Sequence, residues 1–205
     1  MDEPLRAQTP NEVPYYLMVT SCAGCGRGPL APVEPPEPAG DALRQGPGPR
    51  EAVVYARCRR CGRDHTFRFR WQHDVPAAAD DPDGINPTDQ PSRIIDLGQW
   101  VGLYCHFSDA SSSAEPPGES RRLARRAALC LAEALKFHAG AELPPESAFS
   151  CEASAAAYRQ NPANYARTRL RELQALLPAA AHRAHPDAGG ADAHASHPWW
   201  RFWEK

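Results

Sequence analysis

The sequence is poor in lysine and has no long apolar run. Lys136 and Lys205 are its only lysines, and all other basic side chains among the 23 are arginines. No stretch of about 18 consecutive apolar residues occurs, so we predict no transmembrane helix. The formal net charge of −2 favours neither nucleic acid nor a membrane as the partner of the whole chain. A basic and apolar leader is missing too, and we therefore expect a cytoplasmic protein.

Motifs of the common enzyme classes are missing as well. The sequence contains no nucleophile elbow, no phosphate-binding loop and no dinucleotide-binding fingerprint. The residues that could form a second metal site or a cysteine–histidine pair are Cys105, His106, Cys130, His138 and Cys151. Cys105 and Cys130 fall on apolar faces of predicted helices, where a thiol acts as a small hydrophobic group. We therefore expect a protein that is not an enzyme.

Two short cysteine motifs are the strongest signal in the chain. Both have the form Cys-x-x-Cys-Gly, at residues 22–26 and 58–62. Two residues between the cysteines let both sulfurs of one turn point at the same ion, and two such turns supply four thiolates. The glycine can adopt the positive φ that the turn requires. We expect one structural Zn²⁺ bound by Cys22, Cys25, Cys58 and Cys61.

Strand-like segments surround these motifs. Residues 13–20 and 51–57 are expected to form strands that run into the first and the second motif. Between residues 65 and 71 apolar and polar side chains alternate, which predicts a third strand. This order resembles a four-cysteine zinc ribbon over residues 13–73, which implies a small three-stranded antiparallel sheet around the metal. It implies no single function, since zinc ribbons serve as nucleic-acid binders, protein adaptors and structural units.

Two other uses of the paired motifs remain open. Two disulfides would suit an oxidising compartment, but the chain has seven cysteines, an odd number that fits a reducing interior better. The motifs also resemble those of rubredoxin, which would imply redox iron and electron transfer. The proline usual inside the second rubredoxin motif is missing, because Arg59 and Arg60 stand there.

Three segments are predicted to lack regular structure. Residues 1–12 are polar and expected to be disordered. Within the ribbon, residues 29–50 are rich in proline and are expected to form a long exposed loop that joins no strand ladder. Residues 74–91 contain five aspartates and four prolines, and they predict an acidic linker.

Between residues 92 and 178 apolar side chains recur at helical spacing. They predict four helices, from residue 92 to the serines at 111–113, at 120–139, at 148–160 and from 161 to 177. Asparagine and proline at 161–162 are typical of a helix start. The chain is therefore expected to be α+β, a zinc ribbon followed by an all-α four-helix domain. This combination is similar to small uncharacterised bacterial zinc-ribbon proteins.

Residues 179–205 are predicted to be a flexible tail that ends in an aromatic motif. The motif contains Trp199, Trp200, Phe202 and Trp203. Burial of a large apolar side chain gains about 1.5–3 kcal/mol. The motif is therefore expected either to fold back onto the helical domain or to anchor a partner protein.

Arginines gather around the second cysteine motif. Between residues 57 and 70 six arginines are opposed by a single acidic residue, Asp64. Such a basic surface suits phosphate contact, and a solvated arginine face is the alternative. The candidate nucleic-acid contacts are Arg57, Arg59, Arg60, Arg68 and Arg70.

Together these features favour a non-catalytic binding or adaptor protein with structural zinc, whose helical domain or tail contacts a protein partner. A zinc ribbon that binds nucleic acid through its arginines is the alternative, and rubredoxin-like electron transfer is a distant third.

Overall fold

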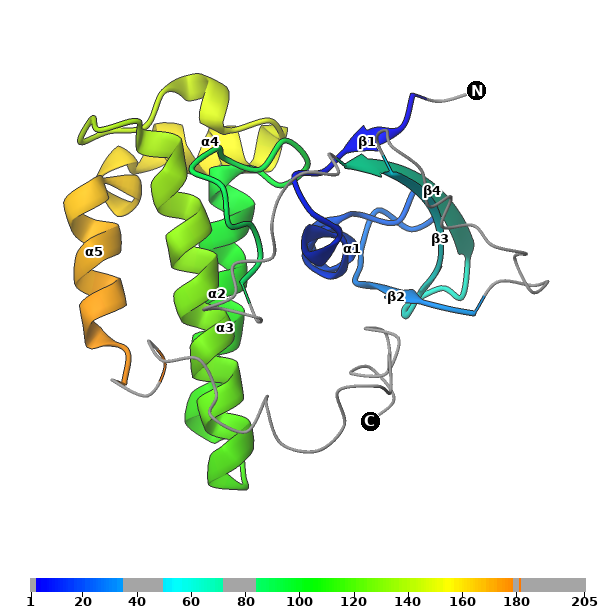
Figure 1. Cartoon of the computed structure of the whole chain (residues 1–205), viewed down its shortest axis with the longest axis horizontal. Helices are drawn as coiled ribbons and strands as arrows, with labels where there is room; N and C mark the ends of the chain where they lie inside the picture. Colours follow the sequence, from blue (N-terminus) through cyan, green and yellow to red (C-terminus); the bar gives the residue numbers. More distant parts are fainter. Residues whose placement is uncertain (1–2, 35–49, 72–83, 179–180, 182–205) are drawn as a thin grey trace. The chain divides into compact units, whose positions relative to one another are not determined.

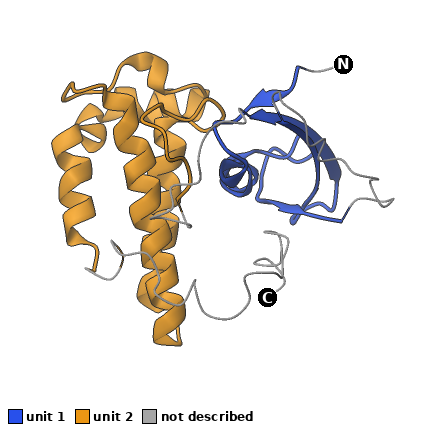
Figure 2. Cartoon of the chain, viewed as in Figure 1, with its two compact units in different colours: residues 1–76, 186–205 blue, residues 77–185 orange. Residues whose placement is uncertain are grey.

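A computed structural model describes residues 3–34, 50–71, 84–178 and 181 of the chain. These residues belong to two compact units (Figure 2). Residues 3–34 and 50–71 lie in unit 1, which contains all the described strands, and the other described residues lie in unit 2, where they form helices. The expected α+β class is confirmed.

Unit 1 is built on a mixed sheet of four strands (Figure 1). The strands are β1 (Leu5–Arg6), β2 (Leu30–Pro32), β3 (Arg50–Cys58) and β4 (Asp64–Trp71). Their order in the sheet is β1-β4-β3-β2. β3 runs antiparallel to both of its neighbours, whereas β1 runs parallel to β4. The prediction of a three-stranded antiparallel sheet is therefore wrong. The short strand β1 lies at one edge of the sheet and the short strand β2 at the other.

Residues Val13–Val19 form helix α1 and not the predicted strand. The helix lies inside the curve of the sheet (Figure 1), where Leu17 is 1% exposed. The ring of Tyr16 meets the rings of Phe67 and Phe69 edge-on, with centroids 5.7 and 5.5 Å apart. A short apolar run suits a strand or a helix equally well, and the sheet face that it covers decides between them.

Strands β3 and β4 each have one face turned toward α1. On β4 the predicted alternation is confirmed, since Phe69 and Trp71 are buried while Arg68 is exposed. The buried cluster beside the two cysteine motifs is small and includes two of the cysteines themselves. Its members are Leu17, Cys22, Leu30, Ala56 and Cys58.

The polar start of the chain is ordered from residue 3 onward, although residues 1–12 are predicted to be disordered. β1 pairs with β4, and the amide of Ala7 donates to the carbonyl of Arg70 at 2.9 Å. The 3₁₀ helix η1 (Pro10–Glu12) follows, and its Glu12 is fully buried. Pairing with a distant strand therefore orders a segment whose own sequence favours no structure.

The proline-rich segment 29–50 also contributes to the sheet, against the prediction that it joins no strand ladder. In β2, Leu30 lies opposite Cys58 and is 2% exposed. Pro32 is tolerated because β2 is an edge strand, where a missing N–H need not face a neighbour. Residues 35–49 lie outside the described part of the chain.

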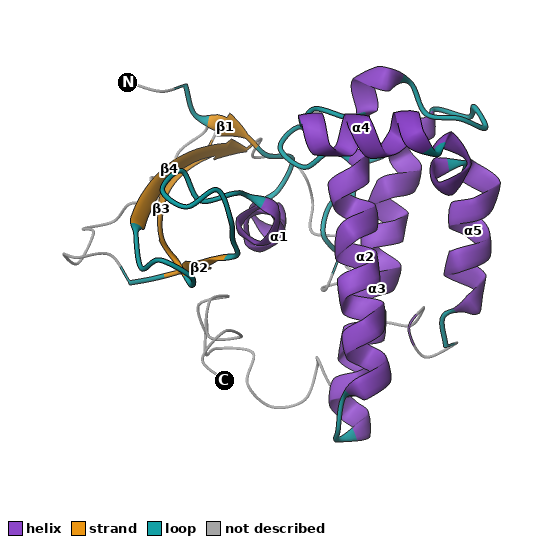
Figure 3. Ribbon diagram, turned by 180° about the vertical axis from the view of Figure 1, so that it is seen from behind, coloured by secondary structure: helices purple, strands orange, loops and turns teal. Residues whose placement is uncertain are grey.

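In unit 2 the described residues form four α-helices and three 3₁₀ helices. Figure 3 labels the α-helices. The α-helices are α2 (Leu97–Ser113), α3 (Pro117–Leu135), α4 (Glu152–Gln160) and α5 (Arg167–Leu176). The 3₁₀ helices are η2 (Lys136–His138), η3 (Glu146–Ala148) and η4 (Pro162–Tyr165). The asparagine and proline at 161–162 begin η4, so the last α-helix starts later than predicted.

Helix α2 begins at Leu97 because Asp96 caps it. The Asp96 carboxylate accepts from the Gln99 amide at 2.8 Å, and the Gln99 side chain accepts from the Asp96 amide at 2.9 Å. This reciprocal pair is a capping box. The other Asp96 oxygen accepts from the amides of Ser150 and Cys151, both at 3.1 Å. One carboxylate thus fixes the start of α2 and ties it to the segment before α4.

Residues 84–91, predicted as the end of the acidic linker, belong to unit 2 and contact its helical part through Lys136. Asn86 is 5% exposed, and its carbonyl accepts from the Lys136 ammonium at 2.6 Å. Lys136 also pairs with Glu133 at 2.8 Å. Burial raises the pKa of Glu133, and the Lys136 charge partly offsets that rise. Residues 72–83 lie outside the described part.

Candidate metal centre

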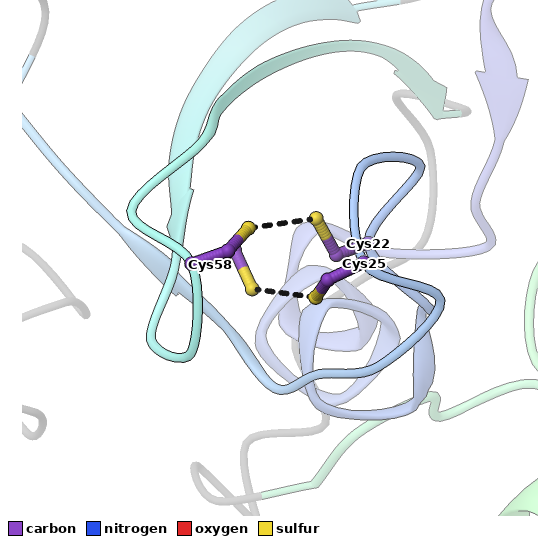
Figure 4. A group of neighbouring side chains, drawn as sticks. Cys22, Cys25 and Cys58 are labelled. Atoms are coloured by element: carbon purple, nitrogen blue, oxygen red, sulfur yellow. Dashed lines mark hydrogen bonds between the residues drawn. The ribbon is translucent and has the colours of Figure 1, made fainter.

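The two cysteine turns of unit 1 bring four sulfurs together. The Sγ atoms of Cys22, Cys25, Cys58 and Cys61 all lie within 4.8 Å of one another. Cys22 and Cys61 are 3.6 Å apart and Cys25 and Cys58 are 3.8 Å apart, measured between sulfurs. Figure 4 shows the Cys25 sulfur turned toward that of Cys58, and the Cys22 sulfur turned into the same group. A tetrahedral zinc with bonds of about 2.3 Å would separate its sulfurs by about 3.8 Å. The group could therefore hold one metal ion.

The glycine that ends each turn has the backbone conformation predicted for it. Gly26 has a φ of 67° and Gly62 a φ of 74°. Their amides donate to the carbonyls of Cys22 and Cys58 at 2.8 and 2.9 Å, which closes each turn. A side chain at either position would be strained, because this region of φ disfavours residues with a Cβ.

The two turns are built alike although they join different elements. The first follows α1, and the second connects β3 to β4. In the first, the Cys22 amide donates to the carbonyl of Arg27 at 2.7 Å; in the second, the Cys58 amide donates to the carbonyl of Arg63 at 2.9 Å. Each pair is separated by the same number of residues, so the turns present their sulfurs in equivalent ways.

Amides of the turns also change the acidity of the thiols. The Cys61 amide, partly opposed by burial, lowers the pKa of Cys58 to about 7. Burial raises the pKa of Cys22, but hydrogen bonds from the Gly24 and Cys25 amides outweigh it and lower the pKa to about 7. The thiolate is the form that binds a metal, so both cysteines are prepared for it.

Cys61 shows the opposite behaviour. The Arg63 amide lowers the pKa of Cys61, but its hydrogen bonds with the sulfurs of Cys22 and Cys58 raise the pKa to about 11. Several thiolates at such distances repel one another. A bound cation removes this repulsion because it supplies the largest positive charge at the site.

Protection from solvent differs between the cysteines. Cys22 and Cys58 are each 1% exposed, whereas Cys61 is exposed and Cys25 is partly buried. None of the seven cysteines, all of which lie in described residues, forms a disulfide. The structure therefore gives no support to the disulfide interpretation of the two motifs.

His65 is a neighbour of this centre that the sequence prediction did not include. Its Nε2 lies 3.2 Å from the Cys22 sulfur, and its ring stacks on Phe67 with centroids 6.1 Å apart. A histidine at this distance can donate a hydrogen bond to a metal-bound thiolate. The alternation along β4 indicates this position of His65, because residue 65 shares the inward face with Phe67 and Phe69.

The predicted nucleic-acid arginines on the strands are engaged with acids. Arg57 pairs with Asp64, Nε to Oδ1, at 2.6 Å. Arg68 and Arg70 both pair with Glu51, the former at 3.5 Å. Hydrogen bonding from Arg70 is the main cause that lowers the pKa of Glu51.

Glu51 precedes the arginine-rich stretch in sequence, so the charge pattern of residues 57–70 does not include it. The antiparallel register places it directly opposite Arg70. Exposed ion pairs of this kind stabilise a fold little, but they reduce the charge available to a phosphate. The strand face is therefore a weaker nucleic-acid surface than its sequence suggests. The other two predicted contacts, Arg59 and Arg60, lie in the second cysteine turn.

Cys105, His106, Cys130, His138 and Cys151, which all lie in described residues, do not form a second metal centre. Cys130 is fully buried, and burial raises its pKa well above the usual value. Cys105 is exposed, so the prediction that it lies on a buried apolar face is wrong. Cys151 caps α4, and Nε2 of buried His138 lies 2.9 Å from the carbonyl of Tyr165. Within the described residues, the structure brings together no second group of three or more metal-binding side chains.

The predicted aromatic contacts lie outside the described residues. They are Trp199, Trp200, Phe202 and Trp203. In the part of the chain that is described, no helix has the length and apolar character needed to cross a membrane.

The chain matches no protein-family model, no curated protein and no solved structure. The four cysteines beside the strands are consistent with a zinc-ribbon-like site. The surrounding fold differs from the predicted ribbon in its helix before the first turn and in its parallel edge strand.

Proposed function

We propose that this chain is a non-catalytic binding protein in which Cys22, Cys25, Cys58 and Cys61 hold one structural Zn²⁺. The observation that carries the proposal is the distance between paired sulfurs, 3.6 and 3.8 Å, which suits a tetrahedral ion. Four protein ligands leave no open position for a substrate or water, and for that reason the role is structural. Thiolate ligands suit zinc and iron alike, and zinc is the ion most often held this way in closed four-cysteine sites.

The size of unit 1 also supports a structural role. The buried cluster beside its cysteine turns is small, and two of the ligands, Cys22 and Cys58, are part of it. Small domains often require a metal, disulfides or a partner for stability, because they bury little apolar surface. A metal that joins the turn after α1 to the turn between β3 and β4 would supply that stabilisation.

A protein partner is the second part of the proposal. The helical unit and the C-terminal aromatic motif are the regions in which we place its binding surface. Tryptophan and arginine are the residues that most often dominate protein interfaces, and residues 199–203 consist of these types and phenylalanine. The protein would then act as an adaptor that contacts its partner through the helical unit or the aromatic motif.

The test is the metal content of the untagged full chain, purified under reducing conditions, with Cys58→Ser beside it. We expect one equivalent of zinc in the natural sequence and its loss in the variant. Cys105→Ser is the matched control, since this exposed thiol lies outside the centre, and it should keep its zinc. One equivalent of iron, visible as a red protein, would instead support rubredoxin-like electron transfer. A metal-free but folded protein would disprove the structural role.

A further inference from the structure

Arginines occur at the tips of the two cysteine turns as well as on the strands. Arg27 follows the first turn, Arg60 lies within the second, and Arg63 follows it. We call these three the tip arginines. All are exposed, and Arg59 lies beside them.

The tip arginines differ from the strand arginines in their partners. Arg57, Arg68 and Arg70 form ion pairs with Asp64 or Glu51. In the described part of the chain, the structure shows no ion pair between a tip arginine and a carboxylate. The charge of the tip arginines is therefore available to an external anion, whereas that of the strand arginines is partly used.

The position of Arg63 links the two turns. A Cβ built on Gly24 would lie 2.7 Å from Cδ and 3.1 Å from Nη1 of Arg63. The side chain of the second turn therefore lies across the first, in space that Gly24 leaves open. The equivalent hydrogen bonds to the carbonyls of Arg27 and Arg63 hold both backbones in place. The Arg63 charge thus lies beside the first turn, at the end of unit 1 that carries the cysteines.

The negative charge of a metal centre would not cancel the positive charge of the tip arginines. A zinc bound by four thiolates carries two negative charges. The three tip arginines carry three positive charges, and Asp64, the acid next to Arg63 in sequence, already pairs with Arg57. A positive excess therefore remains at the turns.

The chemistry of the tips favours phosphate over a protein partner. Besides cysteine, residues 22–28 and 58–63 contain only alanine, glycine and arginine. Arginine can anchor a protein interface, but these segments supply no large apolar or aromatic side chain to pack beside it. Phosphate contacts need charge and close backbone approach, which arginine and glycine provide.

We propose that the tip arginines bind the phosphate backbone of nucleic acid. This inference rests on the proposed function only in that the metal holds the two turns together. Because no aromatic side chain lies in the tips, bases would not be stacked, and binding would show no sequence preference. The salt dependence follows from the number of contacts. Three contacts to a single strand predict a slope of about −2 in a plot of log affinity against log salt, or roughly an 18-fold loss between 50 and 200 mM.

The experiment is fluorescence anisotropy of a labelled single-stranded DNA oligonucleotide of mixed sequence, titrated with the zinc-loaded full chain. Arg60→Gln/Arg63→Gln should reduce the slope to about −0.7. The matched control is Arg68→Gln/Arg70→Gln, which removes the same charge from the strand face and should leave the slope near −2. Gly24→Ala should also weaken binding, because it displaces Arg63 without changing the net charge.

An equal decrease of the salt slope in both double variants would overturn the proposal, since DNA binding would then follow the net charge alone. Competition by polyglutamate as effective as that by unlabelled DNA would overturn it too, because an acidic protein would then fit equally well. Zinc content is measured for each variant. Weaker DNA binding by Arg60→Gln/Arg63→Gln with one equivalent of zinc retained supports the tip site. Absence of DNA binding by the zinc-loaded natural protein contradicts the tip site. That second result would not contradict the structural role of zinc.

Discussion

In unit 1 a buried cluster gathers around the cysteines, whereas in unit 2 the buried residues line long helices. The cluster of unit 1 joins Cys22 and Cys58 to three other buried residues. In α2, Trp100 is completely buried, as are Leu131 in α3 and Leu170 in α5. Unit 2 thus has the apolar burial of an ordinary helical domain, while unit 1 adds to a smaller core a site for a cross-linking ion. The two units should respond differently to the same perturbations.

Metal removal is expected to have the largest effect and to act on unit 1 alone. Structural zinc contributes about 10–16 kcal/mol of binding free energy in small zinc domains, more than a small core supplies. A chelator with a reductant should therefore abolish the amide signals of β3 and β4 in NMR spectra of the full chain. The signals of α2 and α3 should persist, because their packing includes no cysteine ligand.

Readdition of zinc should restore the lost signals, which is the control for damage to the protein. If β3 and β4 keep their signals without metal, the contrast between the units is wrong. If the helices lose theirs as well, the units depend on one another.

Truncation of a core leucine should have the next largest effect and act on unit 2. Leu131→Ala removes a side chain with no exposure and should lower the free energy of unfolding by about 2–5 kcal/mol. Zinc content should remain at one equivalent. Leu176→Ala is the matched control, because this side chain is 78% exposed and its loss should change stability little. Denaturant unfolding followed by circular dichroism measures both, and equal effects would contradict the assigned core.

Glycine substitution should give the smallest effects, with opposite signs in the two units. Gly62→Ala forces a side chain into a φ of 74° and should destabilise unit 1 by about 1–2 kcal/mol. Gly102 lies inside α2, where an added Cβ would meet nothing within 4 Å. Gly102→Ala should stabilise unit 2 by about 0.5–1 kcal/mol. Thermal unfolding of each variant gives the sign, and a neutral Gly62→Ala would mean that the turn tolerates a side chain.

Prediction from sequence was most accurate where a signal is local. The spacing of the cysteines predicted the turns, because two intervening residues and a glycine leave few backbone conformations. The alternation around Phe69 predicted β4, and the periodic apolar residues predicted the helices of unit 2. Helix ends were less accurate. The start of α2 depends on Asp96, whose capping role could be seen in the sequence, while its contacts with Ser150 and Cys151 could not.

The sequence by itself determined which four cysteines form the two turns, the conformation of the glycines after them, strand β4 and the helical character of unit 2. Each of these depends on residues within a few positions. Only the tertiary structure decided that Val13–Val19 is a helix, that β1 and β2 complete the sheet, and that Glu51 meets Arg70. It also placed His65 beside Cys22 and Arg63 across Gly24. These features join distant segments, and their free energy comes from burial and register, which no short stretch of sequence contains.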